Sequence, residues 1–385
     1  MRPLSGPDVV VFFSIVIWSI ILELSILELL SFVLDVLVHL PAIFIDISLQ
    51  LLGLRKREVP HYRNISNPLQ QLIIQLVAYA FDKVHYRVGR LFFSSHNCLR
   101  FLRWRYRGAL PFRTFTIDES KTHKAVLVYM FDGGRPAQQA KQVILYIHGG
   151  GLIVGSVPFY AEFLASLASQ CDNTMVFSPE YDLVPEACYP TQLDQITAVL
   201  LHIIQKFPEA RIVLGGDSAG AGLCQSLLLC LSVGGTLSPQ STIHKCFYIS
   251  PWLDFESHHA HTKGHGDYIS PEAVLRYGKW YMREASVDVG VEHQRLEANP
   301  LNCDARQIRD SLPANGLLVL SGGSECLLSN SKRFVSQVQE IPGFSVKWLI
   351  EPDEIHAYVL TNLYLRTGKK RLSGFRAVLD FLKVP

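Results

Sequence analysis

The chain has 385 residues, 49% of them hydrophobic, so it can bury one large core or two ordinary ones and is not an intrinsically disordered protein. Its formal net charge of +2 gives no overall reason to expect a nucleic-acid partner. The eight cysteines include no C-x-x-C pair and no other metal-ligand spacing, which indicates small apolar core residues.

The amino-terminal 54 residues are strongly apolar and favour attachment to a membrane. Residues 9–22 carry no charge, but fourteen residues are fewer than the roughly 20 that cross a bilayer core of about 30 Å. At about 100° per residue, Glu28, Asp35 and Asp46 project within roughly 20° of one direction, which predicts a polar stripe on an apolar helix. Two structures fit: a short span followed by an in-plane amphipathic helix broken near Pro41, or a wholly monotopic anchor.

The basic residues after this leader indicate a membrane surface as a partner. Residues 55–113 contain 12 Lys or Arg and only two acidic residues. Beside an apolar leader this excess favours anionic lipid over nucleic acid, the alternative being a solvated helix face. The basic cluster at residues 55–57 favours a cytosolic position for the part of the chain on its carboxyl side. Asn64 begins the one N-glycosylation sequon in the chain.

We therefore expect two parts, a membrane anchor at residues 1–60 and a catalytic domain at residues 61–385. A cleaved signal peptide is the alternative for the first part. The apolar region is too long for one and lacks a small-x-small site near its end.

Hydrophobic residues in the second part alternate between strand and helix patterns. An amphipathic helix at residues 69–92 comes first. Predicted strands lie at residues 112–117, 124–130, 143–147, 174–178, 211–214, 245–249, 316–321 and 346–350. Predicted helices lie at residues 160–170, 191–206, 219–232, 331–340 and 371–382. This alternation predicts an α/β fold with a mostly parallel central sheet, helices on both faces, and catalytic groups at the carboxyl ends of strands.

The sequence Gly216-Asp217-Ser218-Ala219-Gly220 matches the G-x-S-x-G nucleophile elbow. An apolar strand precedes it and a helical run comes after it. The nucleophile of such an elbow sits in a strained turn, and glycines two residues away avoid collisions with the neighbouring strand and helix. We predict Ser218 as a catalytic nucleophile, the alternative being an ordinary glycine-rich turn.

A second glycine-rich sequence, His148-Gly149-Gly150-Gly151, directly follows a predicted strand, 67 residues before the predicted nucleophile. Acyl transfer generates an oxyanion, and side-chain-free backbone N–H groups can approach it closely. We predict that Gly149, Gly150 and Gly151 form the oxyanion hole together with the N–H of Ala219. His148 is expected to order the loop, and the alternative for the whole sequence is a flexible turn.

The base and its orienting acid should follow the serine in the order acid, then histidine. His356 is the only histidine after residue 293 and is therefore predicted as the general base. Glu325 lies just past the end of a predicted strand and is predicted as the orienting acid. The other candidates, Glu351, Asp353 and Glu354, are too near His356 in the chain to reach the far side of its ring easily.

These motifs resemble the hormone-sensitive-lipase branch of the α/β-hydrolases, which pairs H-G-G-G with G-D-S-A-G. The resemblance covers roughly residues 143–384. Residues 178–186 look like the branch's D-Y-R-L-A-P-E stretch, and residues 250–254 look like its S-P-W-x-D. At the acid position, where the branch usually has Asp in G-x-D-x-L, this chain has Glu325. The resemblance implies an α/β-hydrolase fold and a carboxylic ester hydrolase that forms an acyl-enzyme, without cofactor or metal.

We expect a lid from residues 61–110 and 255–312. The second segment carries histidines that invite a metal hypothesis, although the family resemblance needs no metal. These histidines are His258, His259, His261 and His265.

The anchor and the extended lid resemble the fungal steryl acetyl hydrolases and, more distantly, arylacetamide deacetylase. That resemblance implies an endoplasmic-reticulum membrane enzyme with a lumenal catalytic domain that removes short acyl groups from hydrophobic alcohols such as sterols. Its partners would be a hydrophobic ester and membrane lipid, with no nucleic acid. Two other functions stay open: a lipase acting on longer acyl glycerides, and a non-catalytic ligand binder like the gibberellin receptors, which resemble this branch but have lost the histidine.

Overall fold

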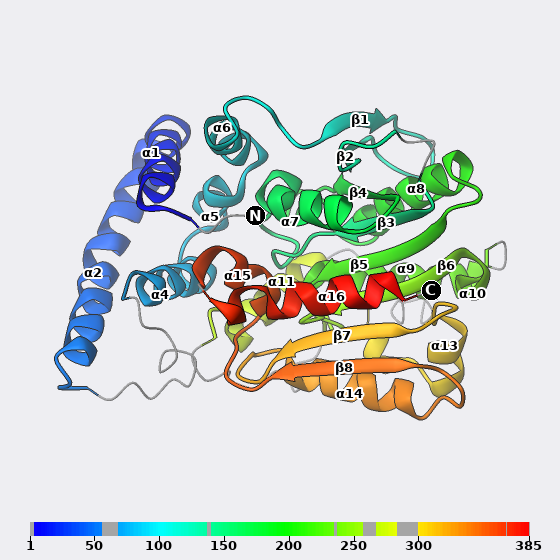
Figure 1. Cartoon of the computed structure of the whole chain (residues 1–385). Helices are drawn as coiled ribbons and strands as arrows, with labels where there is room; N and C mark the ends of the chain where they lie inside the picture. Colours follow the sequence, from blue (N-terminus) through cyan, green and yellow to red (C-terminus); the bar gives the residue numbers. More distant parts are fainter. Residues whose placement is uncertain are drawn as a thin grey trace.

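The computed structural model describes residues 4–55, 68–136, 140–234, 237–256, 267–282, 299–366 and 368–384. These residues form a layer of amino-terminal helices beside a sheet covered by helices (Figure 1). The helix layer consists of α1 (Gly6–Glu23), α2 (Ile26–Leu51), α4 (Pro68–Asp82), α5 (Tyr86–Phe93) and α6 (Ser95–Arg105).

The sheet has the strand order β1-β2-β4-β3-β5-β6-β7-β8. Its strands are β1 (Arg113–Ile117), β2 (Val126–Phe131), β3 (Gln142–Ile147), β4 (Thr174–Glu180), β5 (Arg211–Asp217), β6 (Ile243–Ile249), β7 (Leu317–Gly322) and β8 (Val346–Glu351). β1 and β2 pair antiparallel, and β3 to β8 are parallel to one another. The central strands are buried on both faces, which explains their continuous apolar sequences.

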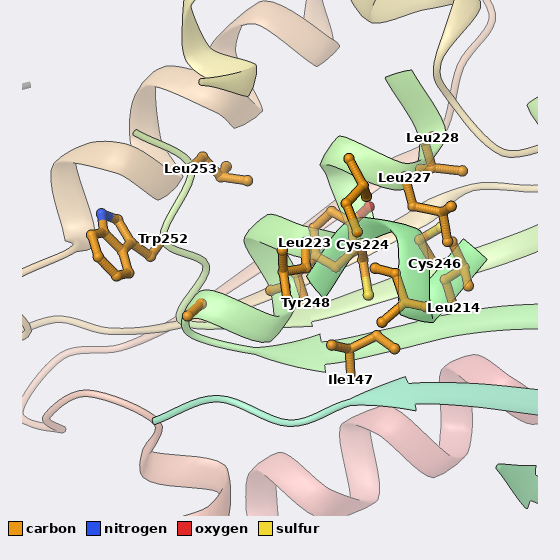
Figure 2. Close-up of a cluster of buried hydrophobic side chains, with 14 of the residues drawn as sticks. Ile147, Leu214, Leu223, Cys224, Leu227, Leu228, Cys246, Tyr248, Trp252 and Leu253 are labelled. Atoms are coloured by element: carbon orange, nitrogen blue, oxygen red, sulfur yellow. The ribbon is translucent and has the colours of Figure 1, made fainter. Parts of the chain in front are cut away.

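Helices cover both faces of the sheet and bury two hydrophobic cores. One core contains side chains of α8 (Thr191–Lys206), α9 (Ala219–Gly234) and α14 (Leu328–Gln339). The other contains side chains of α7 (Val157–Gln170), α15 (Tyr358–Leu365) and α16 (Ser373–Lys383). In the first core, Leu223 and Cys224 of α9 lie against Leu214 of β5 (Figure 2). The predicted fold, a mostly parallel sheet with helices on both faces, is confirmed.

Five shorter helices complete the described part of the chain. They are α10 (Pro239–Thr242), α11 (Pro271–Tyr281), α13 (Ala305–Asp310), and the 3-10 helices η2 (Pro300–Asn302) and η3 (Lys369–Leu372).

The single helix predicted at residues 69–92 is wrong, because α4 and α5 are separate. Donors from α11 take the last carbonyl groups of α4. The Tyr277 hydroxyl donates to the Phe81 carbonyl at 2.6 Å, and Arg276 Nη2 donates to the same oxygen at 2.8 Å. These donors lie almost 200 residues away in the chain, so the periodicity of residues 69–92 carries no sign of them. The contacts also join the described parts of the two predicted lid segments.

α1 and α2 are separate helices because a capping box starts α2. The Glu28 carboxylate accepts the Ser25 N–H at 2.9 Å, and the Glu28 N–H donates to Ser25 Oγ at 3.3 Å. The break expected near Pro41 is wrong: α2 continues through Pro41, and the chain turns at Leu24 and Ser25. By length and composition, α1 and α2 are each long and apolar enough to cross a membrane.

The polar stripe predicted for α2 packs against α4 and α5. Asp46 accepts a hydrogen bond from Gln75 Nε2 of α4 at 3.2 Å. Near the other end of α2, Glu28 pairs with Arg87 of α5 at 2.5 Å. Because these contacts lie on both sides of Pro41, the first half of α2 is held by α5 and the second half by α4, which offsets the hydrogen bond that proline removes.

The amino-terminal end of α1 is fixed by a buried ion network. Arg105 of α6 lies 2.5 Å from Asp8 of α1 and 2.5 Å from Glu162 of α7. All three side chains are at most 5% exposed. Removing one partner of such a network leaves buried charge uncompensated, so the network ties α1 to the helices that cover the sheet.

Candidate active site

Ser218 lies in the turn between β5 and α9. Its φ is 52°, in the left-handed region that residues other than glycine rarely adopt. A Cβ on Gly216 would lie 2.7 Å from the Ala221 nitrogen. One on Gly220 would lie 2.1 Å from the Ile147 carbonyl oxygen. Both glycines are therefore required by close backbone approach, which is the reason that the elbow motif gives for them.

The glycine loop after β3 lies against this turn. Gly150 and Gly151 have φ values of 105° and 63°, and both line the same cavity as Ser218. The N–H of Gly149 instead donates to Asp217 Oδ1 at 2.9 Å. This N–H group already has a partner within the protein and cannot also bind an oxyanion. Of the predicted oxyanion donors, Gly150, Gly151 and Ala219 therefore remain.

His148 is buried beneath the loop. Its ring stacks on Tyr181, with centroids 4.4 Å apart and an interplanar angle of 16°. Nδ1 lies 2.8 Å from the Gly149 carbonyl oxygen, and the Tyr181 hydroxyl donates to the His148 carbonyl at 2.7 Å. Burial lowers the pKa of His148 to about 4, so the ring is neutral at neutral pH. These contacts fix the loop, as expected for an ordering residue.

Asp217 joins the glycine loop to the elbow, a role that the motif alone does not show. In addition to the Gly149 N–H, its carboxylate accepts hydrogen bonds from the hydroxyl groups of Tyr146 at 2.8 Å and Tyr160 at 3.1 Å. Burial raises the pKa of Asp217 to about 6, and the hydrogen bonds partly oppose this shift. The tyrosines come from β3 and α7, so only the folded chain identifies them as partners.

Glu325 follows β7, His356 follows β8, and their side chains meet at the edge of the sheet. Glu325 Oε2 lies 4.0 Å from His356 Nδ1, and catalytic contacts are often this loose without substrate. The same oxygen accepts hydrogen bonds from Ser250 Oγ at 2.5 Å and from the Gly322 N–H at 3.0 Å. Ser250 Oγ also accepts the Ala357 N–H at 2.9 Å. Ser250, to which sequence reasoning assigned no role, therefore positions the acid and the histidine loop together.

Burial disfavours charge on both groups of this pair. It raises the pKa of Glu325 well above its usual range, against hydrogen bonds from Ser250 and Gly322, and it lowers the pKa of His356 to about 3. His356 is consequently neutral at neutral pH, as a general base must be. A proton that it accepts is best stabilised beside the Glu325 carboxylate.

Asp267, from the second predicted lid segment, holds the two loops through their backbones. Its Oδ1 accepts the His356 N–H at 3.0 Å, and its Oδ2 accepts the Cys326 N–H at 2.7 Å. Because Cys326 follows Glu325, one carboxylate fixes the distance between the acid and base loops. Burial raises the pKa of Asp267 to about 7. Sequence reasoning missed it, since no local motif marks a residue 89 positions before its partner.

Two carboxylates close to His356 in the chain have other partners. Glu354 pairs with Arg366 at 3.1 Å, and Glu351 with Lys370 at 3.8 Å. Within the described residues, Glu325 is the carboxylate whose side chain forms an ion-pair contact with His356.

Ser218 and His356 line the same cavity, whose volume is about 560 Å³. The two donor glycines of the loop also line it. From this reactive end the cavity extends beneath α1, α2 and α4, where its wall is almost entirely apolar. Ser218 is 7% exposed and His356 3% exposed, so a substrate reaches them through the cavity.

Three features of the sequence lie wholly or partly outside the described residues: residues 56 and 57 of the basic cluster, the sequon at Asn64, and the histidines at 258, 259, 261 and 265. In the part of the chain that the structure covers, no group of three or more His, Cys, Asp or Glu side chains is placed to hold a metal ion.

Known proteins resemble this chain in sequence. Residues 144–360 match a family model described as the alpha/beta hydrolase fold. An acetyl-hydrolase of Streptomyces hygroscopicus is 28% identical over 249 residues, which cover 64% of this chain and 77% of that protein. Neutral cholesterol ester hydrolase 1 of Pongo abelii is 32% identical over 112 residues, 26% of this chain and 27% of that protein.

Solved structures agree on the fold. An esterase of the bacterial hormone-sensitive lipase family superposes with a TM-score of 0.61 at 22% identity, covering 83% of this chain and 98% of that one. A hyperthermophilic esterase of Pyrobaculum calidifontis superposes with a TM-score of 0.64 at 17% identity, covering 82% and 97%.

Proposed function

Given that the chain belongs to the α/β-hydrolase family, in its hormone-sensitive-lipase-like esterase branch, and is a carboxylic ester hydrolase, we propose that it removes short acyl groups, above all acetyl, from hydrophobic alcohols such as sterols. One observation carries the proposal: a single cavity has Ser218, His356 and the glycine loop at one end and a mostly apolar wall elsewhere. The similar acetyl-hydrolase and neutral cholesterol ester hydrolase support the acyl group and the alcohol.

In the proposed reaction, Ser218 Oγ attacks the ester carbonyl carbon while His356 accepts the hydroxyl proton. Since His356 Nδ1 faces Glu325, the proton goes to Nε2. The negative charge moves to the carbonyl oxygen, where the N–H groups of Gly150, Gly151 and Ala219 stabilise it. His356 then returns the proton to the alcohol as the C–O bond breaks, leaving an acyl-enzyme.

Deacylation repeats these steps with water as the nucleophile. His356 takes a proton from water, the hydroxide attacks the acyl carbon, and the proton passes to Ser218 Oγ as the carboxylic acid leaves. Burial keeps the pKa of His356 low, so the base is available at the start of both half-reactions. Glu325 stabilises the transient imidazolium in each.

We also propose that the enzyme is attached to the endoplasmic-reticulum membrane with its active site on the lumenal side. The two long apolar helices support attachment, and the resemblance to membrane-bound deacetylases supports the compartment. A membrane-impermeant fluorophosphonate tests the side: in sealed microsomes we expect Ser218 to react only after permeabilisation. Labelling in intact microsomes would place the site in the cytosol.

The function is tested with membranes that contain either the wild-type protein or the Ser218→Ala variant. We expect serine-dependent hydrolysis of a sterol acetate and little hydrolysis of a long-chain triglyceride. Triglyceride cleavage alone would identify a lipase, which the volume and apolar wall of the cavity make the second candidate. Absence of cleavage of both, with an intact binding cavity, would favour a ligand binder.

A further inference from the structure

The amino-terminal helices supply much of the wall of the catalytic cavity. α1 contributes Phe12 and Ile17, α2 contributes Val36 and Ile43, and α4 contributes Val77 among other side chains. Residues 32, 36, 40 and 43 of α2 all line the cavity and are spaced to lie on one face of the helix. The segment that resembles a simple anchor is therefore part of the substrate site.

The opposite face of α2 is also apolar and has no protein partner to bury it among the described residues. Leu30, Leu34, Leu37 and Ile45 are 54%, 63%, 64% and 59% exposed. A surface this rich in exposed leucine and isoleucine is unfavourable in water and suits lipid acyl chains. α2 thus separates the cavity on one side from a lipid-facing surface on the other.

α2 lies along its neighbours over its whole length (Figure 1). Besides the contacts at Glu28 and Asp46, its His39 ring lies 5.0 Å from the Tyr79 ring of α4. If α2 crossed the bilayer, α4 would have to enter the hydrocarbon beside it, because Tyr79 of α4 lies against His39 near the middle of α2. α4 ends less than one turn later at Asp82, so this carboxylate would lie near the bilayer centre, where a charge is costly.

One side chain of this layer both lines the cavity and is accessible to a large degree. Ile17 of α1 is among the lining residues and is 54% exposed. The volume of about 560 Å³ lies within the roughly 300–1,000 Å³ of ligand pockets.

From these observations we propose that α1, α2 and α4 form a lateral port embedded in one leaflet of the bilayer. A hydrophobic ester dissolved in that leaflet enters between these helices, places its apolar body against them, and presents its ester group to Ser218. The proposal takes the chemical class of the substrate from the proposed function. It adds that the substrate enters from the membrane and that α2 lies in the membrane plane.

A matched pair of variants tests the port. Val36→Trp fills the cavity side of α2, whereas Leu34→Trp adds the same side chain to the lipid-facing side two residues away. In phosphatidylcholine vesicles, we expect Val36→Trp to lower the ratio of kcat/KM for sterol acetate to that for p-nitrophenyl acetate at least about tenfold. Leu34→Trp should leave the ratio at the wild-type value. Equal ratios in both variants would overturn the port.

The labelling of Ser218 keeps this test independent of the natural substrate. We expect Val36→Trp to slow labelling by a long-alkyl fluorophosphonate relative to labelling by an ethyl fluorophosphonate, which also shows that the variant is folded. If wild-type protein reacts faster with the long-alkyl probe than with the ethyl probe, and Val36→Trp removes this difference, but neither cleaves sterol acetate, the proposed function fails and the port stands. If Val36→Trp labels with both probes as wild-type protein does, the port fails.

The orientation of α2 is tested with lipids brominated at different depths. Leu34 and Ile45 are on the same face, about 16 Å apart along the axis at 1.5 Å per residue. After subtraction of the five native tryptophans, Leu34→Trp and Ile45→Trp should be quenched at the same depth. Quenching at depths that differ by most of that distance would show a spanning helix and overturn the in-plane layer.

Discussion

The sheet and the amino-terminal helix layer differ in how far their apolar side chains are buried. Every residue of β3 and β7 is buried. Of the described side chains of α2, by contrast, only that of Ile47 is buried. The sheet needs no further partner, so it can hold the reacting groups rigidly, whereas the exposed apolar face of α2 is the surface that the proposed lateral port places in the bilayer. Under this proposal the sheet carries out the chemistry, and the helix layer selects and admits the substrate.

The sharpest test of this division removes the nucleophile. We expect Ser218→Ala to lower kcat by about 10⁴-fold or more on soluble and membrane-borne esters alike, because all chemistry depends on the elbow. Covalent labelling by a fluorophosphonate, followed by mass spectrometry of the modified residue, checks this. Labelling that persists in the variant would move the nucleophile elsewhere.

The acid should have the next largest effect. Glu325→Gln keeps the shape of the side chain but removes the charge that stabilises protonated His356, and we expect kcat to fall about 10²- to 10⁴-fold. Asp353→Asn, three residues from His356, is the control and should stay near wild type. Steady-state kinetics on a short ester measure both, and the reverse order would identify Asp353 as the acid.

The junction between the two regions is tested at Arg105. Arg105→Met leaves Asp8 and Glu162 as an uncompensated buried pair, and we expect a loss of about 3–5 kcal/mol in the free energy of unfolding. Arg103→Met, on the exposed side of the same helix, should change it by less than about 0.5 kcal/mol. Denaturant unfolding in mixed micelles compares them. Equal stability would show that the helix layer is only loosely attached.

A smaller effect is expected at the backbone clamp. Asp267→Asn retains an acceptor for one N–H group but removes the charge, and we expect kcat to fall about tenfold through displacement of the acid and base loops, with KM little changed. Asp267→Glu keeps the charge but should still have a lower kcat than wild type, because the longer side chain shifts both loops. A change confined to KM would contradict a positioning role.

The mildest effect concerns pH. An ordinary histidine, with a pKa of about 6.5, would keep only about 3% of its neutral form at pH 5. Since burial lowers the pKa of His356 to about 3, protonation of this histidine should not limit the rate at pH 5. Burial raises the pKa of Glu325, so any loss of initial rate on a soluble ester between pH 7.5 and pH 5 should come from Glu325 and be absent in Glu325→Gln. A rate that falls tenfold per pH unit below 6.5 in Glu325→Gln would contradict this.

The lowered pKa of His356 also makes the free energy of unfolding depend on pH, and it lowers stability in acid. Unfolded chains protonate this histidine near pH 6.5, whereas the folded protein resists protonation until about pH 3. The unfolded state therefore binds more protons between these values, and the contribution of His356 to stability falls as the pH drops from 6.5 towards 3.

The sequence allowed prediction of features that depend on local backbone geometry. Gly216 and Gly220 mark the elbow because backbone atoms lie too close to them for a side chain. For Gly216 these atoms belong to residues 220 and 221, and for Gly220 they belong to Ile147 in the adjacent strand β3. The parallel sheet follows from continuous apolar runs that alternate with helical periodicity. The motif order singled out His356 and Glu325, and the structure places their side chains in contact.

Features that depend on distant residues were missed for the same physical reason. Ser250 and Asp267 act through hydrogen bonds to loops 59 to 107 residues away, and no period or motif records such a pairing. Pro41 suggested a break because proline removes a helical hydrogen bond, yet contacts with α4 and α5 compensate for it. The stripe of polar residues on α2 was visible, but not that another helix would cover it.

The buried network of Asp8, Arg105 and Glu162 constrains how this enzyme can evolve. A gene truncated at its start would encode a protein with two opposite charges at a newly opened surface and a cavity lacking part of its wall. Deletion of α1 and α2 alone would therefore open the catalytic cavity to water. A closed cavity would then need new apolar side chains on its wall, so we expect these helices and the catalytic domain to be retained together.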